Sequence, residues 1–266
     1  MAARTSISDT SAYLAKVTEA VESDEAFARF RVQPYLAAIF DIVGSTGMQQ
    51  AFINNHLDVA EKVFPALMSL LGLARLNDTI GGAPVFPTRH GVDLSAATAR
   101  YFKYLADLRH MFGRLDGWNI VEVGGAYGGL SALMHSTYQG HASHRLYDLP
   151  EVNRLAARYH HSLGVSGVSY HTSAELDDGA PVPSDLFIST HALSEINRDL
   201  QQVYIDRLVK PARHGYVLYN HFFEDEGSEI MALAEFAAQI PGCKLVADLP
   251  FVLQTDARHP STLIVW

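Results

Sequence analysis

The chain has 266 residues, of which 48% are hydrophobic and 18% are charged, and its formal net charge is −9. That composition predicts a globular protein with a large core and one or two domains. The acidic residues are spread along the chain and no basic block occurs, so we expect no nucleic acid and no anionic membrane as partner.

The number of cysteines and the lengths of the apolar runs indicate the cellular compartment in which the protein is expected. The single cysteine, Cys243, excludes an internal disulfide, fits a reducing environment and stands in a strand-like apolar run expected in the core. The N-terminal residues lack the apolar region of a signal peptide, and the longest apolar run, residues 63–74, is too short to span a bilayer. We therefore expect a cytoplasmic protein in which residues 63–74 form a buried helix.

The N-terminal part of the chain has the pattern of helices. Apolar residues recur at spacings of three and four, as in Val59, Val63 and Leu67. The expected helices cover residues 12–23, 33–42, 47–56 and 57–73, followed by a Gly/Pro-rich loop at 77–90 and a further helix at 94–112.

These helices define an N-terminal helical cap region, residues 1–90, ahead of a second domain, residues 91–266. We expect the cap region to cover the ligand site. It should also contribute to a homodimer, because the apolar run at 63–74 needs a partner surface.

From residue 119 the pattern changes to strands that alternate with helices. The expected strands cover residues 119–123, 144–148, 168–172, 185–190, 215–220, 243–249 and 261–266. This alternation predicts the α/β class, with a doubly wound, seven-stranded, mostly parallel sheet covered by helices on both faces. The last two strands have no helix between them, so they should form an antiparallel hairpin at the sheet edge, which makes the last strand antiparallel.

The first of these strands runs directly into a glycine-rich turn. The pattern is E-x-G-x-A-x-G, from Glu122 through Gly124, Ala126 and Gly128. Such a turn lets a ligand approach the backbone without a side chain in the way. The helix expected from about Gly129 would offer its free N–H groups and positive dipole end to that ligand. The alternative is a plain connection between strand and helix.

Asp148 ends the next strand, about one βαβ unit beyond Glu122, where an acid that binds a ribose is expected. A carboxylate at this place can accept hydrogen bonds from both ribose hydroxyls. Asp148 can instead cap the helix expected at residues 150–163, and the two roles are compatible. The order of strand, glycine turn, helix, strand and acid predicts a nucleoside cofactor.

The glycine turn argues against a nucleoside triphosphate. A phosphate-binding loop of that type ends in Gly-Lys-Ser/Thr, and residues 128–131, Gly-Gly-Leu-Ser, contain no lysine. Ala126 replaces the middle glycine that would contact a pyrophosphate, and the bulky Tyr127 follows it. Of a dinucleotide and S-adenosylmethionine, the turn therefore favours the ligand without phosphates.

Three pieces of the sequence resemble known methyltransferases. Residues 121–130, Val-Glu-Val-Gly-Gly-Ala-Tyr-Gly-Gly-Leu, look like motif I of Rossmann-like S-adenosylmethionine-dependent methyltransferases. With residues 147–151, Tyr-Asp-Leu-Pro-Glu, and residues 184–220, which include Tyr204, they resemble more narrowly the bacterial sugar O-methyltransferase family. That family more often has an Asn-Tyr-like pair where Thr190-His191 stands, at the place where substrate is expected.

The resemblance implies the fold, the cofactor and the reaction. Residues 91–266 would form a Rossmann-like domain that binds S-adenosyl-L-methionine, and an antiparallel last strand would distinguish its sheet from a dinucleotide-binding one. The implied activity is O-methylation of a small polar metabolite, a sugar or a carboxylate, in a bacterial biosynthetic pathway.

The adenine is expected beside Ser173 and Ala174, after the third strand, where methyltransferases of this type hold the base. Ser173 can instead be the cap of an ordinary helix start. The residues expected to contact the cofactor are Glu122, Gly124, Gly125, Tyr127, Gly128, Asp148, Leu149, Ser173, Ala174 and Ser189.

Methyl transfer to an alcohol needs an aligned nucleophile and a group that removes its proton. Histidine suits that task because its ordinary pKa is near 6.5. His191 follows the fourth strand and His221 follows the fifth, so each is a candidate base. Glu195 could orient the imidazole of His191 if the intervening segment is helical. The plainer alternative is that His191 only contacts the cofactor or caps a helix, with Glu195 structural.

A catalytic metal is not expected. The 13 histidines show no H-E-x-x-H spacing, and the adjacent pair His160-His161 would point to different faces of a helix. The fourth strand does not end in a carboxylate, which a metal-dependent catechol-type methyltransferase would need.

Other functions share these motifs, because the motifs bind cofactor and do not choose the leaving group. One is an S-adenosylmethionine enzyme that closes a ring by intramolecular attack and releases methylthioadenosine. Another is a nonenzymatic adenosyl-binding protein. A dehydrogenase is a weaker reading. The masses of the products distinguish methylation from ring closure, and nicotinamide binding tests for a dehydrogenase. In every case the expected partner is a small molecule.

Overall fold

The computed structural model describes residues 10–40, 44–138, 143–176, 179–220, 229–249 and 261–266. In this part of the chain, no helix combines the length and the apolar character needed to cross a membrane.

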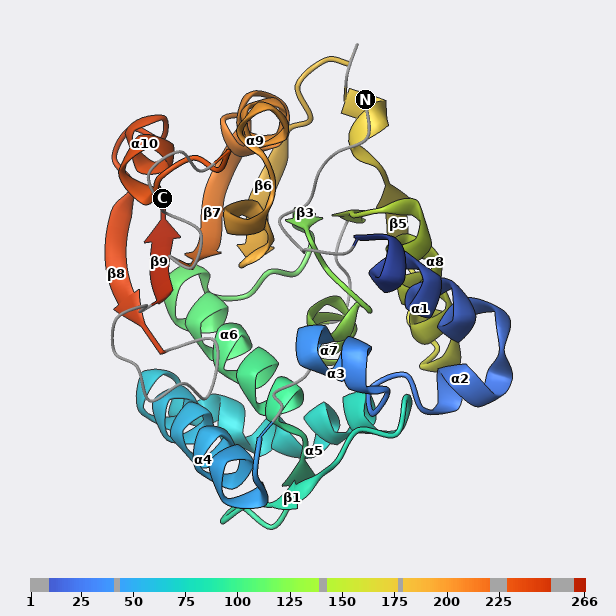
Figure 1. Ribbon diagram of the computed structural model, residues 1–266. Helices are drawn as coiled ribbons and strands as arrows, with labels where there is room; N and C mark the ends of the chain where they lie inside the picture. The colour runs from blue at the N-terminus through green and yellow to red at the C-terminus, as the bar shows by residue number, and fades with distance from the viewer. Residues whose placement is uncertain (1–9, 41–43, 139–142, 177–178, 221–228, 250–260) are drawn as a thin grey trace.

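A seven-stranded sheet forms the centre of the molecule (Figure 1). Its strands are β3 (Asn119–Val123), β4 (Ser143–Tyr147), β5 (Val168–His171), β6 (Ser184–Thr190), β7 (Ala212–Tyr219), β8 (Lys244–Asp248) and β9 (Ser261–Val265). Their order across the sheet is β5-β4-β3-β6-β7-β9-β8, with β3 to β7 parallel and β9 antiparallel to both of its neighbours. The expected fold class, a mostly parallel sheet with an antiparallel last strand, is confirmed.

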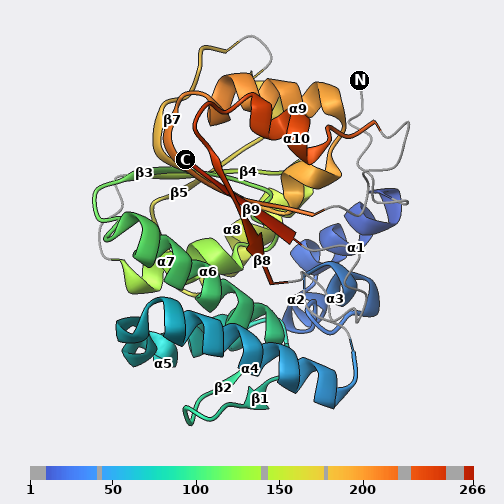
Figure 2. The ribbon, with the colours of Figure 1, turned by 90° about the vertical axis from the view of Figure 1, so that its left-hand side faces the viewer.

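Helices cover both faces of the sheet (Figure 2). One face carries α6 (Ala96–Phe112), α7 (Gly129–Thr137) and α8 (Pro150–Ser162). The other carries α9 (Arg198–Tyr204), continued by a π-helical turn at Ile205–Val209, and α10 (Leu233–Ala238). Successive residues of a strand point to opposite faces of the sheet and so pack against different groups of helices. Ile120 packs with the first group of helices, and Val121 packs with the second.

The N-terminal residues form helices and 3-10 turns beside the first face. They are α1 (Thr10–Glu22), α2 (Asp24–Ala28), α3 (Pro34–Phe40), α4 (Thr46–Val63), 3-10 turns at Pro65–Leu70 and Arg75–Asp78, and α5 (Leu71–Ala74) between them. A two-residue hairpin, β1 (Phe86–Pro87) with β2 (Asp93–Leu94), precedes α6. Helix α1 packs against α8, and α4 packs along α6 (Figure 1).

Two expectations about these helices are wrong. The helices expected at 47–56 and 57–73 are one helix, α4, which ends at Val63 because Pro65 lacks the N–H that a helix interior requires. Residues 63–74 are therefore not one buried helix: Leu67 and Leu71 are buried, but Leu73 is exposed. Cys243 is only half-buried. Homodimerisation through the cap region stays a prediction.

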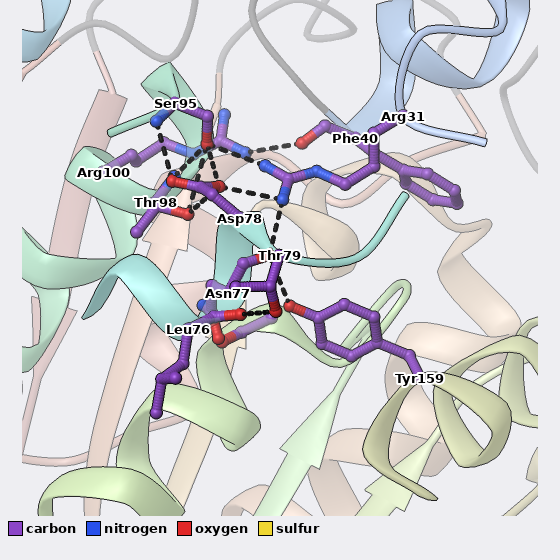
Figure 3. Close-up of polar contacts among 11 residues, drawn as sticks. Arg31, Phe40, Leu76, Asn77, Asp78, Thr79, Ser95, Thr98, Arg100 and Tyr159 are labelled. Carbon is purple, nitrogen blue, oxygen red and sulfur yellow. Dashed lines mark hydrogen bonds and ion pairs between the residues drawn. The ribbon is translucent and has the colours of Figure 1, made fainter. Parts of the chain in front are cut away.

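A buried polar cluster ties the N-terminal helices to the rest of the molecule (Figure 3). The Arg31 guanidinium donates from Nη1 to Asn77 O at 2.8 Å and to Asp78 Oδ1 at 2.9 Å, and from Nη2 to Ser95 Oγ at 2.7 Å. Both side chains of the Arg31–Asp78 ion pair are almost completely buried. Tyr159 of α8 donates to the same Asn77 carbonyl at 2.9 Å. The cluster thus joins the segment after α2 to Ser95, directly before α6. Through Asn77 and Tyr159 it also reaches α8.

Candidate functional site

A cavity of about 190 Å³ lies at the carboxyl ends of β3, β4, β5 and β6, where ligands bind in open α/β sheets. One wall comes from the strand ends and contains Glu122, Val123, Gly124, Gly125, Ala126, Tyr147, Asp148, Leu149, Thr172 and Ser173. The second comes from α1, α3 and α6 and contains Tyr13, Ile39, Phe40, Arg100, Tyr101 and Tyr104. The segment after β6 and helix α9 complete it with Thr190, His191, Ala192, Glu195, Ile196, Leu200 and Tyr204.

The glycine turn brings backbone close to its surroundings. Gly124 has φ +76°, and a Cβ there would stand 2.0 Å from the Cβ of Ala192. A Cβ on Gly125 would stand 2.5 Å from Leu146 Cδ1. The Gly124 N–H donates to Tyr147 O at 2.9 Å, which fixes the turn to β4. Both glycines are therefore required for this close packing as well as for any approach of a ligand.

Asp148 connects the turn to the start of α8. The Ala126 N–H donates to Asp148 Oδ2 at 3.1 Å, and the Leu149 N–H donates to Oδ1 at 2.8 Å. Burial raises the pKa of the carboxyl to about 7, against the effect of these two hydrogen bonds. The helix-cap alternative is wrong, because Leu149 is the N-cap residue and no side chain caps the first turn of α8 there.

Two further side chains belong to this region; the sequence did not indicate Asn153, and it indicated Tyr204 only as part of the resemblance, without a role. Asn153 of α8 donates from Nδ2 to His171 O at 2.7 Å and to Asp148 O at 3.2 Å, bracing the ends of two strands. Tyr204 of α9 lines the cavity, as does Ser173. An amide side chain on a helix carries no local sequence signal for contacts such as those of Asn153.

Glu122 lines the cavity but is already engaged. Its Oε2 lies 2.8 Å from His144 Nε2, and both side chains are almost completely buried. This pair joins β3 to β4 directly behind the glycine turn.

Four residues expected at the cofactor do not line the cavity. Tyr127 is fully buried in an aromatic cluster, with its ring centroid 5.5 Å from that of Phe30 and 5.0 Å from that of Tyr159. The space beside Gly128, at φ +87°, is filled by His160, whose Nε2 would lie 2.4 Å from an added Cβ. Ser189 is buried and Ala174 is exposed to solvent.

Ser173 and Ala174 begin a 3-10 turn, Ser173–Leu176, after β5. The two side chains differ in placement, because Ser173 lines the cavity, whereas Ala174 is exposed to solvent and does not line it. Thr172 and Ser173 are thus the lining side chains that this turn contributes, among its described residues, beside the expected adenine position.

His191 lies where β6 ends, with φ +75°, at the start of a 3-10 turn over Ala192–Glu195. Its Nε2 lies 3.2 Å from Tyr104 Oη. Burial lowers the pKa of the imidazole well below its ordinary value, and the positive charges of Arg100 and Lys103 lower it further. Both effects favour the neutral form of the ring.

Glu195 lines the cavity one turn later. Its Oε1 accepts a hydrogen bond from Asn220 Nδ2 at 3.0 Å, and His191 contacts Tyr104. The orientation of the His191 imidazole by Glu195 stays a prediction. Burial raises the pKa of Glu195 to about 7. The second candidate base, His221, lies outside the described residues.

The cap region was expected to cover the site, and α1 and α3 line the cavity; the contribution of α6 and the individual side chains of this wall were not predicted. Arg100 is buried, at 4% exposed, yet lines the cavity together with Tyr13 and Tyr104. Within the described ranges, no group of three histidine, cysteine or acidic side chains is arranged to hold a metal ion.

Comparisons with known proteins find likeness at the level of the fold. No family model and no curated protein matches the sequence. An O-methyltransferase family 2 protein from Planctomyces limnophilus, solved with apigenin, is 16% identical over 59% of this chain and 52% of its own, with a TM-score of 0.43. The chain thus spans about half of that protein.

Two other solved structures cover more of their own length. The N-terminal domain of EvdMO1, solved in the presence of SAH and D-fucose, is 13% identical over 60% of this chain and 80% of its own, with a TM-score of 0.46. Thermoplasma acidophilum 1320 is 16% identical over 64% of this chain and 87% of its own, with a TM-score of 0.42. At these values the likeness concerns the fold alone.

Proposed function

We propose that this protein is an S-adenosylmethionine-dependent O-methyltransferase of a small polar metabolite. The observation that carries the proposal is the cavity at the strand ends. It is lined by the glycine turn after β3, by Asp148 after β4 and by Ser173 after β5. These are the places expected for the approach of the cofactor to the backbone, for its ribose and for its adenine.

The chemistry of the cavity fits S-adenosylmethionine. Asp148 supplies a carboxylate for the ribose hydroxyls, and Gly124 and Gly125 leave backbone at the surface. Asp148 and Glu195 both have a pKa raised to about 7 by burial, so a bound cation such as a sulfonium would favour their charged forms. When bound, the cofactor supplies an electrophilic methyl group.

The residues of the chain would contribute positioning and the exclusion of water. The aromatic side chains of α1, α3 and α6 enclose the cavity opposite the strand ends, which strengthens electrostatic interactions inside it. His191, which lies next to Tyr104 of this wall, would contact the reacting acceptor. His221 and Glu195 would contribute to proton transfer.

The test starts with S-adenosylmethionine alone and calorimetry of its binding. Incubation with acceptors then follows, with mass analysis of every small product. A gain of one methylene supports the proposal, whereas release of methylthioadenosine with ring closure identifies the cyclising alternative. Binding without turnover of any acceptor favours the adenosyl-binding alternative, and nicotinamide binding in place of S-adenosylmethionine contradicts the cofactor assignment.

A further inference from the structure

One edge of the central sheet is exposed. Strand β8 ends the strand order, at the opposite side of the sheet from β5, and among the described strands it pairs with β9 alone (Figure 1). Residues 244–247 of β8 are exposed, and they include two large apolar side chains, Leu245 at 51% and Val246 at 45%. An edge strand of this kind is a template on which another strand can form backbone hydrogen bonds.

The hydrogen bonds of β9 show which side of β8 each residue faces. Gly215 of β7 and Trp266, which follows β9, exchange both of their backbone hydrogen bonds, at 3.2 and 3.4 Å. Trp266 therefore bonds toward β7. Successive residues of an antiparallel strand bond to alternate sides. Leu263, three residues before Trp266, therefore bonds toward β8.

The outward-facing backbone groups of β8 follow from this alternation. Val246 is the register partner of Leu263, so Val246 bonds toward β9. Its neighbours Leu245 and Ala247 then turn their N–H and C=O groups to the outer side of the strand. A further antiparallel strand must place its own hydrogen-bonding residues opposite these two. A second copy of β8 does so when a twofold axis passes through Val246, because Leu245 of each copy then lies opposite Ala247 of the other.

The charges of β8 favour this register over others that the backbone would allow. Lys244 and Asp248 stand at the two ends of the strand, so a twofold axis at Val246 sets each of them opposite the other on the second copy. Asp248 pairs with Lys103, which also lies 2.8 Å from Asp107 Oδ2. Two carboxylates here contact one ammonium, and Lys244 of the second copy would add a positive charge beside them. Opposite charges across a strand pair are stabilising.

The apolar side chains fit the same register. Val246 would face its own copy in a non-hydrogen-bonded pair, where the Cα atoms are about 4.5 Å apart and the side chains are close. On the other face of the sheet, the large Leu245 would meet the small Ala247. Apolar pairs of this kind stabilise antiparallel strands, and they would remove from water the two most exposed apolar side chains of β8.

We propose that β8 pairs antiparallel with β8 of a second copy of this chain, about a twofold axis at Val246, so that the two sheets become one. This surface is separate from the cap region, whose contribution to a homodimer is an independent prediction. It does not depend on the proposed function. The strand has only five residues, which suggests an interface at the small end of the known range, so we expect a dissociation constant in the micromolar range.

Sedimentation equilibrium of the full chain, over a concentration series that spans the micromolar range, measures the dimer. Val246→Glu sets two carboxylates opposite each other at the axis and should weaken dimerisation by about tenfold or more. Leu73→Glu is the matched control, because Leu73 is an exposed apolar residue of the cap region, and it should keep the wild-type constant. A protein that stays monomeric, or a dimer that Leu73→Glu disrupts and Val246→Glu does not, contradicts the inference.

Cysteine variants test the register itself, in a Cys243→Ser background that removes the single natural cysteine. Val246→Cys places two cysteines directly opposite each other, with a Cα separation of about 4.5 Å that a disulfide can bridge. Leu245→Cys is the control, since that residue is as exposed but its two copies are diagonal neighbours about 7–8 Å apart, beyond the usual reach of a disulfide.

Mild oxidation should link the Val246→Cys protein into a dimer on a denaturing gel and leave the Leu245→Cys protein monomeric. Linkage of both variants to the same extent would show random collision or another register. Linkage of neither would show that the two strands do not meet. Either result overturns the inference, and the cysteine pair keeps it testable if Val246→Glu fails to fold.

Discussion

Individual side chains around the cavity have contacts specific enough to predict the effect of replacing them. Asp148 is the clearest, because its two oxygens already hold the turn and the start of α8. Asp148→Ala should weaken S-adenosylmethionine binding by about 1.5–3 kcal/mol, the scale of hydrogen bonds to a charged group. Calorimetry measures this, with Glu151→Ala in the first turn of α8 as control. Unchanged affinity in a folded Asp148→Ala protein would remove the ribose role.

The stability of the cofactor-free protein should depend on pH through Glu195. Its pKa is about 7 in the folded state against an ordinary 4.5, so the fold penalises its ionisation. The penalty is absent below pH 4.5, grows as pH rises toward 7 and reaches at most about 3 kcal/mol above it. Glu195→Gln removes the charge and keeps an acceptor for Asn220. Its stability in urea should therefore exceed that of the wild type at pH 8 and match it near pH 4; a pH-independent difference would contradict this.

Replacing His191 distinguishes an acceptor that reacts as a carboxylate from one that must first lose a proton to a general base. With a carboxylate acceptor, His191→Ala should change kcat by less than about tenfold, because no proton is removed. A loss of about 10²–10⁴ with unchanged cofactor affinity would instead identify His191 as a general base. Single-turnover rates at saturating acceptor measure the difference. His221→Ala, measured in parallel, tests the second candidate.

At the scale of elements, the turn after β5 offers a paired test of the adenine position. Ser173 lines the cavity and Ala174 is exposed, although they are adjacent in one 3-10 turn. Ser173→Trp should therefore reduce S-adenosylmethionine affinity by about tenfold or more, while Ala174→Trp should leave it within about twofold, since an exposed substitution fills no cavity. Equal effects of the two substitutions on calorimetric affinity would exclude Ser173 from the binding site.

The sheet was predictable from the sequence because its strands are short apolar runs separated by glycines and helix patterns. The largest difference is at β7, which begins at Ala212 where residue 215 was expected. The N-terminal helices were less predictable. Their apolar spacing continues past Val63, but Pro65 interrupts the hydrogen bonding, and spacing alone does not register that.

The site was predictable only where a local pattern marks it. Gly124 and Asp148 follow strands directly, so their place at the strand ends follows from the topology. Tyr127 was misjudged because adjacency to the turn does not fix the direction of a side chain, and its ring points into the core. Arg100 and Tyr13 reach the cavity by tertiary packing, for which the sequence has no local signal.

At the scale of the whole molecule, the Arg31 cluster is a buried polar connection between the N-terminal helices and the α/β core. Arg31→Met breaks a buried ion pair and should cost about 3–5 kcal/mol, because Asp78 stays buried without its partner cation. Arg89→Met, which breaks exposed pairs with Asp58 and Glu61, is the control and should cost no more than about 1 kcal/mol. Urea unfolding measures both, and similar costs would show that the buried cluster is dispensable.

The packing of α1 against α8 has a consequence for the order in which a ribosome delivers the chain. Arg158 of α8 donates to the Val21 carbonyl at 2.6 Å and places its guanidinium 4.2 Å from the Phe27 ring. Helix α1 therefore lacks these contacts until α8, encoded more than a hundred residues later, has been synthesised. At about 5–20 residues per second, that delay is on the order of ten seconds. During it, the apolar face of α1, which includes Val17 and Ala20, has none of its final neighbours from α8, so nascent chains should need protection there until translation passes residue 162.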